Sequence, residues 1–338
     1  MDLNTLWFVL VGVLFSGYAI LDGFDLGVGI LHLLARNDQE RRINLNAIGP
    51  VWDGNEVWLV TGGGALFAAF PDVYATAFSG FYIAFMLLLF GLIFRAVAID
   101  FRSKVENKTW RRLWDWGFSM GSLLSSFIIG VAMGNIAWGV PIDEQGEFAG
   151  SFLGMLHPYA ILLGLTTVAL FAMHGSIYLA MKTDGDYQRY VRSRINPAII
   201  AFIIGYAIFT IATLLYVPVM TEAIRNNPIF FVVVVMAILA IANIPREINR
   251  NRDNRAFISS CAAMILMMGL FGIGMYPNMI HSLPNPENSL TIYNASSSQG
   301  TLKIMANIAL LGMPIVIAYT VSIYWIFRGK VKLDENSY

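Results

Sequence analysis

Long apolar stretches alternate with short polar segments along almost the whole chain. Eight of them are long enough to cross a bilayer as a helix, which takes about 20 residues. They lie at about 6–33, 77–101, 116–137, 158–181, 197–219, 228–245, 257–277 and 303–327. A ninth, at about 56–70, is short enough to suit a re-entrant segment as well. The pattern predicts an all-α integral membrane protein with nine transmembrane helices, in a single polytopic domain over residues 1–338.

Basic residues predict which way the helices are threaded. With the N-terminus outside and nine spans, the inner segments hold 19 of the Lys and Arg residues and the outer segments hold only Arg225 and Lys303. Such an excess marks the cytoplasmic side, so the C-terminal Tyr338 is expected in the cytoplasm of a bacterium, below its inner membrane. Without the short ninth span, this alternation would break midway along the chain.

Composition supports a membrane protein and excludes several other classes. The chain is 57% hydrophobic and 13% charged, whereas soluble domains carry about 25% charged residues. The 22 Lys and Arg balance the 22 Asp and Glu, so no nucleic-acid partner is indicated. The single cysteine, Cys261, excludes an internal disulfide and a cysteine-rich metal site.

Two acids lie inside the first apolar stretch, in DGFDLGVGIL. The helical rise places Asp22 about 3 Å and Asp25 about 8 Å to the cytosolic side of mid-membrane. Charged acids at such depths cost at least about 2.5–3.5 kcal/mol and normally face protein, water or a cation. Gly23 and Gly27 have the GxxxG spacing that allows close helix approach. Asp22 suits a structural role and Asp25 a proton carrier, and a structural role for both stays open.

A second pair of acids opens the short span, in PVWDGNEVW. Asp53 and Glu56 are three residues apart at its cytosolic entry. They suit a proton path, but acids are also common at a helix N-terminus, where they stabilise the first turn. Further along, Gly62, Gly63 and Gly64 predict a close-packing face.

Charged residues also occupy the third and fourth spans. Arg95 lies about a turn and a half inside the cytosolic end of the third span. It can reach the interface with its long side chain or pair with Asp25, Asp100 or Asp115. Asp115 opens the fourth span and suits a helix cap, an interface ion pair or a functional role.

All these polar groups lie in the cytosolic half of the first four spans, as a proton-uptake route requires, because water can link ionisable groups there.

A haem would need axial nitrogens at matching depth on neighbouring helices. No two histidines have such an arrangement, so we expect this chain to bind no haem. The histidines are His32, His157, His174 and His281.

Several motifs together resemble subunit II of the cytochrome bd quinol oxidases. They are DGFDLGVGIL, RNDQERRINLNAIGPVWDGNEVWLVTGGGALFAAFPDVYATAFSGFY, FRSK followed by WDWG, and SLTIYNASSSQGTL. The resemblance is dense over the first 137 residues and loose over 138–260. It implies two four-helix bundles plus one peripheral helix, with about 1–137 as the first bundle and about 158–327 as the second bundle and last helix.

The resemblance also implies the function and the partners. The family's complex couples quinol oxidation to reduction of O2 to water, is electrogenic and takes protons from the cytosol. Its haem-bearing subunit I holds two b-type haems and one haem d, and a small single-helix subunit can join. Subunit II is not catalytic alone and can hold a structural quinone. By matching position, Asp25 and Asp53 belong to a proton path, and Arg95 and Asp115 support the haem region. Glu56 stands where some members have Gln.

Two other functions remain open at this point. A proton-coupled secondary transporter also uses intramembrane acids and Gly-broken helices, but here the acids are confined to one half of the chain and one side of the membrane. A purely structural scaffold for a haem oxidase would keep the family and deny the proton role.

Overall fold

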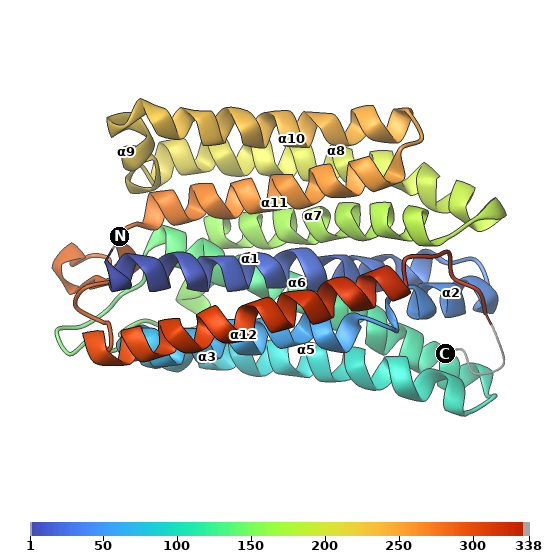
Figure 1. Cartoon of the computed structure of the whole chain (residues 1–338), viewed down its shortest axis with the longest axis horizontal. Coiled ribbons are helices and arrows are strands. Elements are labelled where there is room, and N and C mark those ends of the chain that lie inside the picture. The colour runs from blue at the N-terminus through green and yellow to red at the C-terminus, as the bar shows by residue number, and fades with distance from the viewer. Residues whose placement is uncertain (1, 334–338) are drawn as a thin grey trace.

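The computed structural model describes residues 2–333, which form long helices running along one common axis (Figure 1). The α-helices are α1 (Leu3–Leu31), α2 (Asp38–Ile48), α3 (Trp52–Ala69), α4 (Pro71–Gly80), α5 (Tyr82–Phe101), α6 (Lys108–Trp138), α7 (Pro158–Lys182), α8 (Gly185–Tyr216), α9 (Val219–Asn226), α10 (Phe231–Asn249), α11 (Asp253–Met275) and α12 (Gln299–Ile326). Short 3-10 helices are η1 (His32–Leu34), η2 (Arg102–Lys104), η3 (Leu153–Met155), η4 (Pro228–Phe230) and η5 (Pro286–Asn288). The predicted all-α class is confirmed.

Among the described residues, eight helical segments are long and apolar enough to cross a membrane. Each of the eight long predicted stretches lies on one of them. The short stretch forms α3, whose 18 residues are not among these eight, so a ninth crossing stays a prediction. Tyr338 lies outside the described residues.

The chain bends where the sequence pattern predicts an unbroken span from about residue 77. Here α4 ends at Gly80 and α5 begins at Tyr82. A Cβ on Gly80 would lie 2.8 Å from the ring of Phe148, so the glycine makes room for an outer loop that packs against the bend. This contact is long-range and leaves no local sign in the apolar pattern.

Helix α1 lies in the middle of the molecule and packs against α3, α6, α7 and α11 (Figure 1). At Gly27 the backbones of α1 and α7 touch, since a Cβ there would lie 1.9 Å from the carbonyl oxygen of Phe171. The close approach predicted from the GxxxG spacing is therefore confirmed. It places Asp22 and Asp25 of α1 against protein: both are 0% exposed.

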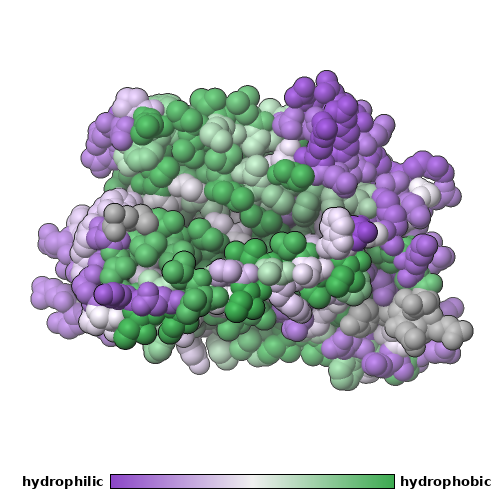
Figure 2. Space-filling view, viewed as in Figure 1, coloured by the Kyte–Doolittle hydropathy of each residue, from purple (hydrophilic) through white to green (hydrophobic). Residues whose placement is uncertain are grey.

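The end of the bundle at which α1 begins carries a small two-stranded antiparallel sheet, which the sequence pattern does not predict. It consists of β1 (Asn278–Ile280) and β2 (Leu290–Thr291). Figure 2 shows a broad hydrophobic band along the middle of the visible face, with hydrophilic side chains gathered toward the two ends. That distribution is the one a bilayer-spanning protein needs.

Candidate functional site

A buried ion pair joins α5 to α1. Arg95 Nη1 lies 2.6 Å from Asp22 Oδ1, and both side chains are 0% exposed. Arg95 Nη2 also lies 3.4 Å from Oε2 of Glu56 on α3. A buried charge is tolerated when an opposite charge accompanies it, so the arrangement explains how Asp22 and Arg95 can lie inside the membrane part of the chain.

Both interpretations of Arg95 from the sequence are wrong. Its side chain is fully buried, so it does not reach the membrane surface, and its partners are Asp22 and Glu56 instead of Asp25, Asp100 or Asp115. The rotation of α1 decides which of its two acids meets α5. Close packing of α5 on α6 closes this side of the cluster, because a Cβ on Gly121 would lie 2.4 Å from the carbonyl oxygen of Gly91.

Asp25 has different partners. Asn55 Nδ2 donates to Asp25 Oδ2 over 2.8 Å and to the carbonyl oxygen of Leu21 over 3.2 Å. The hydroxyl of Tyr324, in the last turn of α12, donates to Asn55 Oδ1 over 2.8 Å. The other carboxylate oxygen, Oδ1, is buried and accepts no hydrogen bond from the part of the chain that the structure describes.

The acids of α3 lie nearer to the surface. Asp53 is exposed in the first turn of α3, and the side chain of Glu56 is 21% exposed. On the same helix, Gly62 packs against Phe15, whereas a Cβ on Gly63 or Gly64 would meet nothing within 4 Å. Within this chain, the predicted close packing is found at Gly62 only, because the side of α3 that carries Gly63 and Gly64 points away from the other helices.

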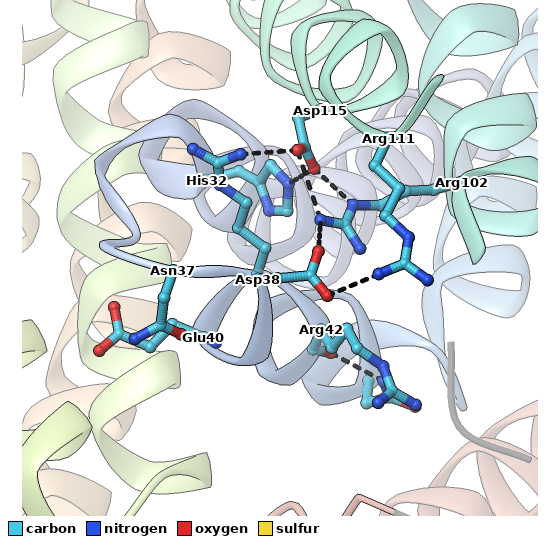
Figure 3. Close-up of polar contacts among 10 residues, drawn as sticks. His32, Asn37, Asp38, Glu40, Arg42, Arg102, Arg111 and Asp115 are labelled. Atoms are coloured by element: carbon cyan, nitrogen blue, oxygen red, sulfur yellow. Dashed lines mark hydrogen bonds and ion pairs between the residues drawn. The ribbon is translucent and has the colours of Figure 1, made fainter. Parts of the chain in front are cut away.

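A second charged cluster, the inner cluster in the predicted orientation, surrounds Asp115 near the start of α6 (Figure 3). His32 Nε2 lies 2.7 Å and Arg102 Nε 2.5 Å from Asp115 Oδ1, and Arg41 Nη1 lies 2.8 Å from Oδ2. Asp38 pairs with Arg102 over 2.7 Å, and also with Arg111. Asp115 therefore forms ion pairs that tie α2, η1, η2 and α6 together.

The structure separates the predicted residues into these two clusters. Asp22, Asp25, Glu56 and Arg95 lie together at the buried one, and Asp53 lies at the exposed start of α3, whereas Asp115 belongs to the inner cluster. Sequence reasoning missed several partners. Those partners are Asn55, Tyr324, His32, Arg41 and Arg102.

The two fully buried histidines are held by other groups of this chain. Both ring nitrogens of the buried His174 are engaged, by Ser260 Oγ and the carbonyl oxygen of Ile20, and His32 is held by Asp115. Within residues 2–333, His, Cys, Asp and Glu form no group of three or more that could hold a metal ion.

A hollow of about 250 Å³ lies where α6 ends and α7 begins. Aromatic and apolar side chains line most of it, with the imidazole of His157 on one side. Its lining includes Asn135, Trp138, Pro141, Phe148, Met155 and His157. Burial lowers the pKa of His157, so its ring is neutral at neutral pH.

Comparisons with known proteins agree along the whole chain. The family model for cytochrome bd terminal oxidase subunit II matches residues 3–327. The cytochrome bd-I ubiquinol oxidase subunit 2 of Escherichia coli (strain K12) is 37% identical, with 98% of this chain and 96% of the relative covered. The cytochrome bd ubiquinol oxidase subunit 2 of Bacillus subtilis (strain 168) is 36% identical, with 99% and 98% covered.

A solved structure shows the same fold. A chain of the bd oxidase from Geobacillus thermodenitrificans superposes with a TM-score of 0.80, covering 97% of this chain and 98% of that one. The two sequences are 17% identical, so this likeness concerns the arrangement of the helices alone.

Proposed function

Because the chain belongs to the cytochrome bd terminal oxidase subunit II family, and is thus a subunit of a quinol oxidase in the membrane, we propose that it carries protons from the cytosol toward the subunit I partner. In this proposal Asp53 receives protons at the inner surface, Glu56 lies beside the route, and Asp25 is the buried carrier. The observation that carries it is the contrast among these acids: Asp53 is exposed, Glu56 partly exposed and Asp25 0% exposed.

The chemistry of the buried cluster supports a carrier role for Asp25. A carboxylate oxygen that accepts no hydrogen bond is open to a proton, and Asp25 Oδ1 is such an oxygen among the described residues. Unpaired buried polar atoms cost about 1–3 kcal/mol each, which favours water beside Asp25. Asp22 differs, since its negative charge is balanced by Arg95.

We further propose nine crossings with the N-terminus outside, α3 being the ninth. Its first turn lies beside the inner end of α12, where Tyr324 contacts Asn55. Its last residue lies beside the outer end, where the N–H of Ser297 donates to the carbonyl oxygen of Ala69 over 2.9 Å. A helix whose two ends meet opposite ends of α12 passes through the bundle. The two-bundle division, with α12 as the peripheral helix, belongs to the same proposal.

For the rest of the complex, the family implies haem cofactors and a subunit I partner. We propose that the partner holds all the haems, two b-type and one haem d, and carries out the reaction of quinol with O2. A small single-helix subunit and lipid would cover part of the remaining apolar surface. The open face of α3 at Gly63 and Gly64 suits close approach of a partner helix, and Arg95 and Asp115 would support the haem region by holding α5 and α6 in place.

A structural quinone would fit the outer hollow. The N–H of Ala160 donates to Nδ1 of His157, so in the neutral ring Nε2 carries the hydrogen and can donate to a quinone carbonyl. Trp138, whose ring centroid lies 5.0 Å from that of His157, would flank the quinone ring.

The test is Asp25→Asn in the purified complex, because the amide keeps the shape of the side chain and removes its titratable proton. Turnover of O2 with quinol should fall while the haem content per complex stays at the parent level. Loss of haem with loss of turnover would show that Asp25 has a structural role instead. Full haem content with full turnover would refute the proton path through Asp25. A transporter would purify without a haem-bearing partner.

A further inference from the structure

The hydroxyl of Tyr324 is connected to Asp25 through one side chain, that of Asn55. Both hydrogen bonds are 2.8 Å long, and Asn55 is 2% exposed. The connection joins α12, α3 and α1, and Figure 1 shows α12 running obliquely to the axis of α1. The ring of Tyr324 also stands edge-on to that of Phe24, with centroids 6.4 Å apart. The last helix therefore reaches the residue next to Asp25 as well as its hydrogen-bond partner.

The directions of the two hydrogen bonds follow from the ionised form of Asp25. A carboxylate only accepts, so the Asn55 amide must turn its NH2 toward Asp25 and its oxygen toward Tyr324, whose hydroxyl donates. A proton on Oδ1 leaves the bond from Asn55 as it is, but its O–H meets no acceptor among the described residues. On Oδ2, the oxygen that faces Asn55, the O–H becomes a donor toward the amide and needs an acceptor. A half-turn of the amide presents the Asn55 oxygen to Asp25 and the NH2 to Tyr324, whose hydroxyl oxygen can also accept.

The side chains of Asn55 and Tyr324 can thus complete the hydrogen bonds of Asp25 in both of its protonation states. Only the first orientation makes the 3.2 Å bond from Asn55 Nδ2 to the carbonyl oxygen of Leu21. Hydrogen bonds to a charged acceptor are also roughly twice as strong as those between neutral groups. The two observations together favour the carboxylate orientation, and a proton on Asp25 opposes that preference.

We propose that Asn55 and Tyr324 form a proton-responsive clamp on Asp25, in which the proton that enters at the open Oδ1 comes to rest on the oxygen facing Asn55, and the Asn55 amide turns over each time that proton is gained or lost. Both are positioning residues, and the clamp rests on the proposed role of Asp25 as the proton carrier. It also makes the inner end of α12 part of the proton path.

Other ionisable groups also face Asp25 from the helices around it. Apart from Tyr324, which belongs to the clamp itself, they are unchanged in the clamp variants below, so a difference in pH dependence can be assigned to the clamp. On the side of α7 and α11, His174 is held by Ser260. The groups that act on Asp25 electrostatically are Asp22 of α1, Glu56 of α3, Arg95 of α5, Tyr178 of α7 and Tyr324 of α12.

The test compares three variants in the purified complex with its partner subunit. Tyr324→Phe removes one hydroxyl and keeps the ring, and Asn55→Leu removes both hydrogen bonds at similar volume. Tyr319→Phe is the control, because Tyr319 lies on the same helix and is 64% exposed. Turnover with quinol is measured as a function of pH, together with the infrared carbonyl band of protonated Asp25, which is identified by its loss in Asp25→Asn.

The clamp predicts a graded shift of the pH profile. Asn55→Leu removes the charge-assisted hydrogen bond to the Asp25 carboxylate, so the ratio of protonated to ionised Asp25 should rise about tenfold over that of the parent complex at any given pH. The fall in turnover at alkaline pH should therefore move up by about one pH unit. Tyr324→Phe should show a smaller shift of the same sign, about threefold, and Tyr319→Phe none. Turnover reduced by one factor at every pH, with the alkaline fall unmoved, would overturn the clamp.

The infrared band separates failure of the clamp from failure of the proton path. Tyr324→Phe should move the carbonyl band of Asp25, because the orientation of the Asn55 amide sets its hydrogen bonding. A band unmoved in Tyr324→Phe overturns the clamp whatever the turnover. Unchanged turnover in Asp25→Asn overturns the proton path instead, and the band still decides whether the clamp exists.

Discussion

Replacing Arg95 by methionine tests the buried ion pair most directly. The change keeps an unbranched side chain and removes the cation that contacts Asp22 at 2.6 Å and Glu56 at 3.4 Å. Removing one partner of a buried pair costs about 3–5 kcal/mol, because the other charge is left uncompensated. For a chain of this size, that corresponds to a fall in the thermal midpoint on the order of 10 °C.

The assay is thermal unfolding of the purified complex, followed together with its haem content. Arg112→Met is the control, since Arg112 is exposed on α6 and an exposed arginine should cost less than about 1 kcal/mol. The double variant Asp22→Asn with Arg95→Met should lose less than the sum of the two single losses, by a coupling of about 0.5–3 kcal/mol. Equal midpoints for Arg95→Met and Arg112→Met would refute the reasoning.

Two further predictions concern the inner side of the molecule. Asp115→Asn should lower the free energy of unfolding by about 3 kcal/mol, because it leaves Arg102, which is 1% exposed, without its main counter-ion. The control Asp38→Asn, at a residue whose side chain is 46% exposed, should lower it by about 1 kcal/mol or less. Equal losses of the two variants in thermal unfolding would contradict this difference. A cysteine placed at Tyr338 should be labelled only from the cytoplasmic side, and labelling from outside would mean that the count of nine spans is wrong by one.

The spanning helices are predictable because a bilayer demands long apolar runs, which any window along the sequence reveals. The polar ends of these helices are not marked in this way. Helix α8 begins at Gly185, well before the apolar stretch at about 197–219, since the membrane constrains only the apolar part. The bend between α4 and α5 depends on Phe148 of an outer loop, and such a contact exists only after folding.

At the candidate site, the sequence reveals the acids but not their partners. An aspartate inside an apolar stretch is conspicuous because it is costly there. Asn55 and Tyr324 are not, since amides and tyrosines are common near helix ends and at membrane interfaces. Asp22 and Asp25 are three positions apart on one helix, so spacing alone places them on a shared face. Only the packing of α3 and α5 around α1 brings Arg95 into an ion pair with Asp22 and Asn55 into a hydrogen bond with Asp25.

The two buried aspartates and Asp115 show why burial alone does not identify a proton carrier. All three are 0% exposed. Both oxygens of Asp115 are occupied by cationic or imidazole donors, and Asp22 is paired with Arg95, so protonating either would break an ion pair and leave a buried cation. Asp25 is bound by a neutral amide, and one of its oxygens accepts no hydrogen bond from the described chain. A proton on Asp25 therefore breaks no direct ion pair and removes a buried charge, which is the property that a carrier needs and an anchoring residue must avoid.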